Sequence, residues 1–155
     1  MVKVLFVCLG NICRSPMAEA VFRHKVNEAN LTEKIMIDSA GTASWHEGKL
    51  PHEGTRIKLD EEVISYDGQV ARQLKQDDFN QFNYIIVMDE ANLNDVKNDF
   101  SVSDDVVVDK LLSYHKNSDV TDVPDPYYTG NFDETYELVD VATEQLLNEI
   151  IREHL

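Results

Sequence analysis

Four short apolar runs, separated by segments of helical periodicity, restrict this chain to a small set of folds. The runs are rich in branched side chains and cover residues 3–7, 35–39, 84–88 and 106–108. Continuous apolar runs of this length are typical of strands that are buried on both faces of a parallel sheet. Because the strands alternate with helices, the sequence predicts an α/β sandwich with a mainly parallel sheet.

The first helix is expected to begin with Ser15 as its N-cap and Pro16 at its first position, since both residue types favour these places. Its buried face is predicted from four apolar residues at helical spacing, namely Ala18, Val21, Phe22 and Val26. Further helices are expected over residues 55–62 and 90–98.

The last helix is predicted to begin at Asn131, with Glu134 as its capping-box partner. One apolar stripe follows along this helix, formed by Val139, Ala142, Leu146 and Ile150. Residues 111–130 contain two prolines and are expected to be irregular. Because the chain shows no linker and no repeat, residues 1–155 are predicted to form a single domain.

The distribution of charge excludes several classes of function. Among 155 residues there are 14 lysines and arginines against 29 aspartates and glutamates, for a net charge of −15. Residues 1–76 hold 10 basic and 10 acidic residues, whereas residues 77–155 hold 4 and 19. We therefore expect no nucleic-acid partner and place any chemistry on an anion in the first half. No apolar run is long enough for a signal peptide or a membrane span, so a cytoplasmic protein with no membrane partner is expected.

The segment after the first predicted strand has the properties of an anion-binding loop. It reads Cys8-Leu9-Gly10-Asn11-Ile12-Cys13-Arg14-Ser15 and lies between a strand and a helix, where parallel sheets bind ligands. A loop this short can turn successive backbone N–H groups toward an anion. Gly10 and Asn11 tolerate the left-handed backbone that such a turn often needs. Arg14 adds a planar fork for two phosphate oxygens.

Cys8 is the predicted nucleophile of this loop. It would face the loop amides, the helix N-terminus and Arg14, all of which favour the thiolate over the thiol. Ser15 is placed to donate a hydrogen bond to the departing sulfur. The leaving group needs a proton donor, and the candidate is Asp125, which lies between two prolines in the segment Val123-Pro124-Asp125-Pro126-Tyr127-Tyr128.

Each of these residues also has a simpler interpretation. Cys8 and Cys13 can be small buried residues, and Asp125 can be a turn aspartate beside prolines. Zinc binding by the two cysteines would need further ligands, and the five histidines show no ligand spacing. Neither a nucleotide-binding P-loop nor a dinucleotide-binding glycine motif is present. The strand before the loop and the Ser-Pro pair after it favour the catalytic interpretation.

Two segments together resemble the low-molecular-weight protein tyrosine phosphatases. They are Asp125-Pro126-Tyr127-Tyr128 and Val7-Cys8-Leu9-Gly10-Asn11-Ile12-Cys13-Arg14-Ser15-Pro16-Met17-Ala18-Glu19. Their order matches the family, with the nucleophile loop near the N-terminus and the acid loop in the last third. Two shorter segments are also similar, Ser39-Ala40-Gly41-Thr42 and Val87-Met88-Asp89. The resemblance implies a three-layer sandwich with a four-stranded parallel sheet, and neither metal nor cofactor.

The resemblance also implies roles for individual residues. Cys8 is the nucleophile that forms a phosphocysteine, Arg14 clamps the phosphate, and Asp125 is the general acid. The phosphate loop and its support comprise Leu9, Gly10, Asn11, Ile12, Cys13, Ser15 and Ser39. The walls of the substrate pocket are expected from Ile12, Trp45, Tyr127 and Tyr128. Some members of the family have a histidine that supports the loop asparagine, and Gln69 takes its place here.

The expected substrate is a protein or peptide that carries phosphotyrosine, with inorganic phosphate as product. Three alternative functions compete with this one. An arsenate reductase on the same scaffold needs additional cysteines, and only two are present. A protein arginine phosphatase has a similar loop but typically threonine where this chain has Ile12. A non-catalytic phosphopeptide-binding module is expected to have lost the nucleophile or the acid, and Cys8, Arg14 and Asp125 are all intact.

Overall fold

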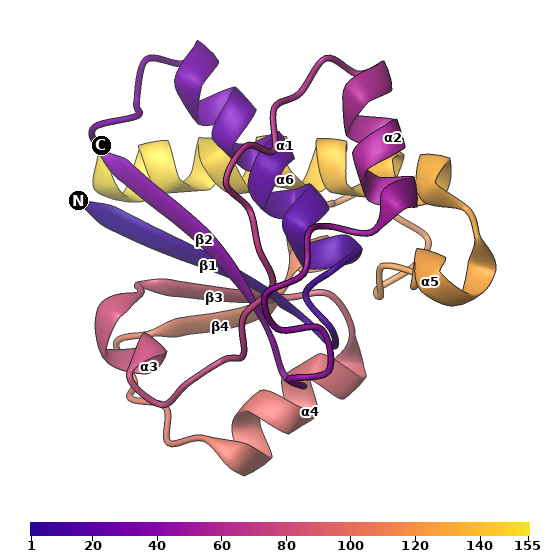
Figure 1. Ribbon diagram of the computed structural model, residues 1–155. Helices are drawn as coiled ribbons and strands as arrows, with labels where there is room; N and C mark the ends of the chain where they lie inside the picture. The colour runs from indigo at the N-terminus through magenta and orange to yellow at the C-terminus, as the bar shows by residue number, and fades with distance from the viewer.

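The structure is a computed structural model that describes residues 1–155 and has three layers (Figure 1). Its central sheet contains four strands, β1 (Val2–Cys8), β2 (Ile35–Gly41), β3 (Tyr84–Val87) and β4 (Val107–Lys110). They are all parallel and lie in the order β2-β1-β3-β4. The predicted α/β sandwich with a four-stranded parallel sheet is therefore confirmed.

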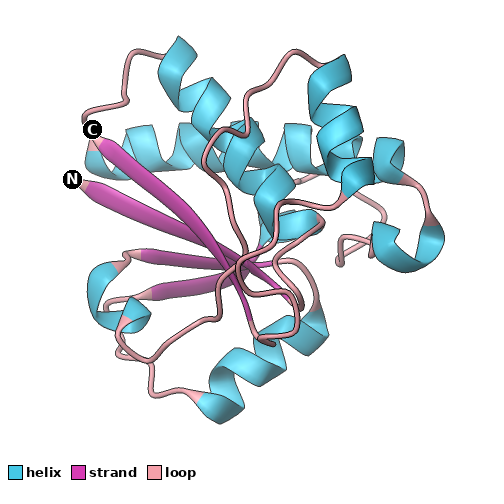
Figure 2. Cartoon of the chain, viewed as in Figure 1, coloured by secondary structure: helices cyan, strands magenta, loops and turns pink.

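Helices cover both faces of the sheet (Figure 2). The longest two, α1 (Arg14–Glu28) and α6 (Phe132–His154), pack on one face and on each other, and α2 (Glu53–Glu61) packs against both. The opposite face is covered by α3 (Asp78–Gln81) and α4 (Glu90–Asp99). A 3₁₀ turn (Leu111–Tyr114) follows β4, and the short α5 (Pro126–Thr129) precedes α6.

The alternation of side chains along β1 divides the core in two. Val4, Phe6 and Cys8 belong to the larger apolar cluster, under α1 and α6. Leu5 and Val7 point the other way, into the smaller cluster under α3 and α4. All five are buried, as a strand in the middle of a parallel sheet requires. Cys8, the last residue of β1, therefore ends on the side where α1 begins.

The capping of two helices differs from the sequence prediction. The first helix begins at Arg14 with Cys13 as its N-cap, so the prediction of Ser15 as N-cap is wrong. Asn131 does cap α6 by accepting a hydrogen bond from the amide of Glu134, but its own amide donates to the hydroxyl of Thr129. The expected capping box at Asn131 is therefore only half formed.

Three short elements lie outside the helices that the sequence predicts. They are α3, the 3₁₀ turn and α5, each of four residues. An element of one turn is too short to show helical periodicity. For this reason α3 was not predicted, and residues 111–130, which contain the other two elements, were expected to be irregular throughout.

The strand order places the carboxyl ends of β1 and β3 side by side. The chain passes from β1 to β2 on one side and then returns to β3 on the other side of β1. In parallel sheets such a reversal opens a crevice at the carboxyl ends of the strands, where ligands bind. No helix in the structure combines the length and the apolar composition that a membrane span requires.

Candidate active site

The loop between β1 and α1 leaves its backbone amides unpaired. No amide of residues 9–14 donates to an acceptor in the protein. The carbonyl groups of the loop are held instead, because the amides of Thr42 and His52 donate to Cys8 (2.9 Å) and Ile12 (2.7 Å). A row of free N–H groups before a helix is the arrangement that binds a phosphate.

Asn11 is the residue that gives the loop its sharp turn. Its φ of 56° lies in the left-handed region, which asparagine tolerates better than most residues. Gly10, which was expected to share this conformation, does not have a positive φ. The need for space accounts better for a glycine here, because a Cβ atom at Gly10 would lie 3.0 Å from Cδ2 of His46.

Gly41, at the end of β2, supports the loop from below. A Cβ atom at this position would come within 2.8 Å of the carbonyl oxygen of Leu9 and 3.0 Å of the amide nitrogen of Asn11. Contacts this close to backbone atoms cannot be relieved by turning a side chain. Only glycine therefore allows β2 to pass so near the phosphate-binding loop.

Cys8 is buried at the bottom of the loop and contacts Ser15. Its Sγ lies 3.0 Å from the Oγ of Ser15, which comes from the first turn of α1. The hydroxyl of Ser15 is engaged there rather than in capping the helix. The N-cap residue, Cys13, makes no side-chain cap either, so the first amides of α1 stay available to a ligand.

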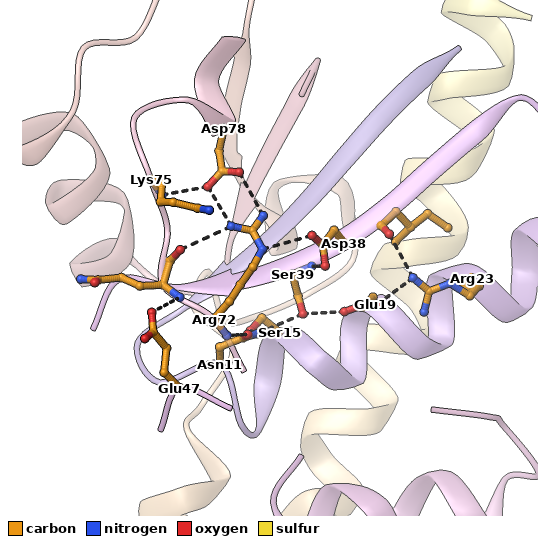
Figure 3. A network of polar contacts seen from close by, with 12 residues as sticks. Asn11, Ser15, Glu19, Arg23, Asp38, Ser39, Glu47, Arg72, Lys75 and Asp78 are labelled. Carbon is orange, nitrogen blue, oxygen red and sulfur yellow. Dashed lines mark hydrogen bonds and ion pairs between the residues drawn. The ribbon is translucent and has the colours of Figure 1, made fainter. Parts of the chain in front are cut away.

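The side chain of Asn11 connects this serine to β2 (Figure 3). Its Nδ2 donates to the Oγ of Ser15 (2.8 Å) and to the Oγ of Ser39 (3.0 Å), and its Oδ1 accepts from the amide of Arg72 (2.9 Å). Gln69 takes no part, since its Nε2 donates to a carbonyl in the first turn of α1. Support for Asn11 therefore comes from Ser39 and Arg72.

Arg14 is fixed by one edge of its guanidinium group. Nη1 donates to Oδ2 of Asp89 (2.6 Å) and to the carbonyl oxygen of Val123 (2.9 Å). Nε is buried without a partner, and Nη2 lies 3.5 Å from Asp125. Burial opposes the charged form, but Cys8, Asp89 and Asp125 outweigh it and raise the pKa of Arg14 above its ordinary value. The edge formed by Nε and Nη2 is thus charged and able to bind two phosphate oxygens.

Asp125 reaches the same place from the N-terminus of α5. Its Oδ1 accepts from the amide of Tyr127 (3.1 Å), and Pro126 occupies the first position of the helix. Its Oδ2 is the oxygen nearest to Arg14. The two prolines and the cap together hold the carboxylate over the loop, while its side chain remains 23% exposed.

Cys13 has a different environment from Cys8, although only five positions separate them. Burial, and then the proximity of Cys8, raise the pKa of Cys13 to about 12. Cys13 is therefore a thiol at neutral pH. Of the two cysteines, only Cys8 contacts Ser15.

These residues line one pocket, together with the aromatic residues that the sequence singled out. Its walls are formed by Cys8, Leu9, Gly10, Ile12, Cys13, Arg14, Trp45, His46, Asp125, Tyr127 and Tyr128. Trp45, Tyr127 and Tyr128 are exposed at the rim. Nowhere in the structure do three or more histidine, cysteine, aspartate or glutamate side chains lie together as metal ligands would.

Two residues at the site were missed by sequence reasoning. Asp89 holds Arg14. Its sequence signals were its place after the third predicted strand and in the family-like segment Val87-Met88-Asp89, but neither indicated a role. His46 lines the pocket next to Trp45 and against Gly10. Its neighbour Trp45 was noted, but a single histidine in a loop carries no spacing that reveals a role.

Comparisons with known proteins agree with this geometry. A sequence model of the family described as "Low molecular weight phosphotyrosine protein phosphatase" matches residues 3–155. The low molecular weight protein-tyrosine-phosphatase YfkJ of Bacillus subtilis is 50% identical over 153 residues, which cover 99% of this chain and 98% of YfkJ. The PtpA protein of Staphylococcus saprophyticus, with the same family name, is 42% identical over 99% of this chain and 96% of its own length.

Solved structures give the same result. The crystal structure of YfkJ from Bacillus subtilis superposes with a TM-score of 0.97 at 49% identity, over 100% of this chain and 98% of YfkJ. A Drosophila arginine phosphatase is also similar, with a TM-score of 0.88 at 32% identity over 96% of this chain and 97% of that chain. The resemblance seen in the sequence is confirmed, and the chain belongs to the low molecular weight phosphotyrosine protein phosphatase family.

Proposed function

We propose that Cys8, Arg14 and Asp125 carry out phosphotyrosine hydrolysis in this chain, which by its family is a cysteine-dependent protein-tyrosine-phosphatase. The observation that supports this assignment is the pocket in which these three side chains meet. It has unpaired loop amides and the Nε–Nη2 edge of Arg14 on one side, and the carboxylate of Asp125, which caps α5, on the other. We further propose that residues 1–155 act as one catalytic domain.

In the first step, the thiolate of Cys8 attacks the phosphorus atom of the substrate in line with the phenolic oxygen. The amides of residues 9–14 and the Nε–Nη2 edge of Arg14 bind the equatorial oxygens and stabilise their charge. Asp125, in its protonated form, gives its proton to the departing phenolate. The products of this step are a phosphocysteine and the free tyrosine side chain.

In the second step, water hydrolyses the phosphocysteine. Asp125 now accepts a proton from the attacking water, and the bond between phosphorus and the sulfur of Cys8 breaks. The hydroxyl of Ser15, 3.0 Å from the sulfur, stabilises the thiolate as it leaves. Inorganic phosphate is released, and the enzyme returns to its starting state.

The proposed substrate is a protein or peptide with phosphotyrosine, and the walls of the pocket support this choice. Trp45 and Tyr127 offer flat apolar surfaces to a phenyl ring, and Ile12 adds a branched aliphatic contact. A phosphoarginine guanidinium would lose water at Ile12 without gaining a hydrogen bond. A phosphoserine is too short to place its phosphate in the loop and also use these walls.

The test is a comparison of kcat/KM for matched peptides that contain phosphotyrosine, phosphoserine or phosphoarginine. We expect a strong preference for phosphotyrosine. Cys8→Ser should abolish turnover while vanadate still binds, because the amides and Arg14 are unchanged. Near-normal turnover in this variant would contradict the role of Cys8. Equal kcat/KM for phosphoarginine and phosphotyrosine in the unmutated protein would favour the arginine phosphatase instead.

A further inference from the structure

A buried carboxylate that the proposed mechanism does not use lies behind the phosphate-binding loop. Glu19 is in the second turn of α1, and its side chain is only 7% exposed. One carboxylate oxygen accepts from the hydroxyl of Ser39 (2.6 Å), and the other accepts from Nη2 of Arg23 (2.6 Å). Figure 3 shows Glu19 and Arg23 at one end of the polar network that reaches Ser15.

The number of hydrogens on each group fixes the direction of the bonds between Glu19 and Cys8. An ionised carboxylate can only accept, so the single hydrogen of the Ser39 hydroxyl points to Glu19. Ser39 must then accept from the amide group of Asn11, whose second hydrogen goes to Ser15. Ser15 therefore accepts from Asn11, and its own hydrogen is left for the sulfur of Cys8.

The backbone of Arg72 supports the same direction from the other side of Asn11. An amide N–H can only donate, and it donates to Oδ1 of Asn11. The guanidinium of Arg72 is itself fixed, because it binds both carboxylate oxygens of Asp78 (3.1 and 3.0 Å) and one of Asp38 (3.1 Å). The orientation of the Asn11 amide is thus set at both of its ends.

We propose that Glu19 is a positioning residue for the phosphatase reaction, and that its ionised carboxylate directs the hydrogen bonds of Ser39, Asn11 and Ser15 so that Ser15 donates to Cys8. Arg23 keeps the carboxylate in place by binding its second oxygen and the carbonyl oxygen of Ile37 (3.0 Å). This inference rests on the proposed role of Cys8 as nucleophile. It assigns Glu19 an effect on Cys8 without any contact between the two.

The substitution Glu19→Gln tests the direction of the network without changing its shape. The new amide would point its oxygen to Arg23, which donates, and its NH₂ group to Ser39. Ser39 would then receive a hydrogen from both neighbours, and its own hydrogen would face the NH₂ group of Asn11. Rotation of the Asn11 side chain removes this conflict at Ser39 and turns an oxygen toward Ser15, at the cost of the bond that Oδ1 of Asn11 accepts from the amide of Arg72. The Ser15 hydroxyl would then donate to Asn11 and no longer to Cys8.

The measurement is the rate of Cys8 alkylation by iodoacetamide as a function of pH, which reports the thiolate without any substrate. Because a hydrogen bond to a charged group is lost, the midpoint of the profile should move upward by about one pH unit in Glu19→Gln. At pH values below the midpoint, the fraction of Cys8 present as thiolate should then be about tenfold smaller. Through-space electrostatics predicts the opposite sign, since removing a negative charge favours the thiolate. An unchanged or lowered midpoint would overturn the proposal.

Two further variants make the result specific. Glu28→Gln removes a carboxylate from the same helix, where Glu28 pairs with His24 and is 70% exposed, and should leave the midpoint unchanged. Ser39→Ala removes the group through which Glu19 acts, so Glu19→Gln should have no additional effect in that background. If the midpoint shifts of Glu19→Gln and Ser39→Ala add up in the double variant, Glu19 does not act through Ser39 and the proposal is contradicted. A midpoint shift of the same size in Glu28→Gln would contradict it as well.

The kinetics separate positioning from damage to the fold. In Glu19→Gln, kcat/KM for an aryl phosphate should fall about tenfold at acidic pH and approach the unmutated value at alkaline pH. A structural defect would lower kcat/KM equally at every pH. Alkylation needs no turnover. If the unmutated protein shows no phosphatase activity but Glu19→Gln still shifts the alkylation midpoint, the effect of Glu19 on Cys8 is supported while the proposed function fails.

Discussion

Replacing Asp89 with asparagine would remove one charge from the site and leave the surrounding helix intact. Asp89 has two roles, because it binds Nη1 of Arg14 (2.6 Å) and also caps α4 by accepting from the amide of Asn92 (2.8 Å). Asparagine is as good an N-cap as aspartate, so α4 should keep its cap. The NH₂ group of the new side chain would instead face the donor on Arg14.

The structure allows the size of the effect to be worked out. The ion pair is largely buried, with the side chains of Arg14 and Asp89 exposed by 3% and 21%. A hydrogen bond between charged groups contributes about 1.5–3 kcal/mol. If the guanidinium must stay in this orientation in the transition state, kcat/KM should fall by roughly 10- to 100-fold, at ~1.4 kcal/mol per factor of ten. The remaining bond from Arg14 to Val123 (2.9 Å) places the expected loss toward the lower end.

The assay for Asp89→Asn should use an aryl phosphate with an acidic phenol, so that proton donation by Asp125 does not limit the rate. Inhibition by vanadate should weaken in parallel, because the same arginine binds both oxyanions. The matched control is Glu90→Gln, since Glu90 pairs with Lys110 (3.2 Å) on the surface and is 57% exposed. A kcat/KM within about twofold of the unmutated protein would refute the argument that this ion pair holds Arg14.

Three further changes test other parts of the structure. Asp125→Ala should lower kcat by about 10²–10⁴-fold for phenols that need protonation, and the loss should shrink across a series of aryl phosphates as the phenol becomes more acidic. Cys13→Ser should recover less activity than the unmutated protein when peroxide treatment is followed by a thiol, because no Cys8–Cys13 disulfide can protect Cys8 from further oxidation. Val63→Gly should raise the free energy of unfolding in urea by about 1 kcal/mol, since Val63 ends α2 with a φ of 58° that strains a branched side chain.

The strands and the nucleophile loop could be predicted because both depend on local sequence. The apolar runs of β1 and β3 are buried on both faces, and so their sequence shows little alternation. Cys8 and Arg14 lie within one loop, so their proximity needs no knowledge of the rest of the fold. Asp125 was found only because prolines flank it and the leaving group needs an acid.

The error at Ser15 has a physical reason. Serine before proline is a common helix start, and in most helices the serine side chain satisfies a free amide. Here α1 begins one residue earlier, at Arg14, and the Ser15 hydroxyl contacts Cys8 and Asn11. A helix whose first amides must bind an anion cannot also have them occupied by a side-chain cap. The rule failed at the point where the proposed function requires it to fail.

Asp89, Glu19 and Arg72 could not be predicted as parts of the site because their roles depend on strand order. Asp89 reaches Arg14 only because β3 pairs with β1, although 75 residues separate the two side chains. Arg72 reaches Asn11 because its segment runs beside the end of β2. The same order places Asp38 next to Arg72 and Ser39 next to Glu19 on consecutive residues of β2. A slip of β2 by one residue would exchange these two side chains between faces and separate Asn11 from both of its supports, so the register of the edge strand is itself a condition for the geometry at Cys8.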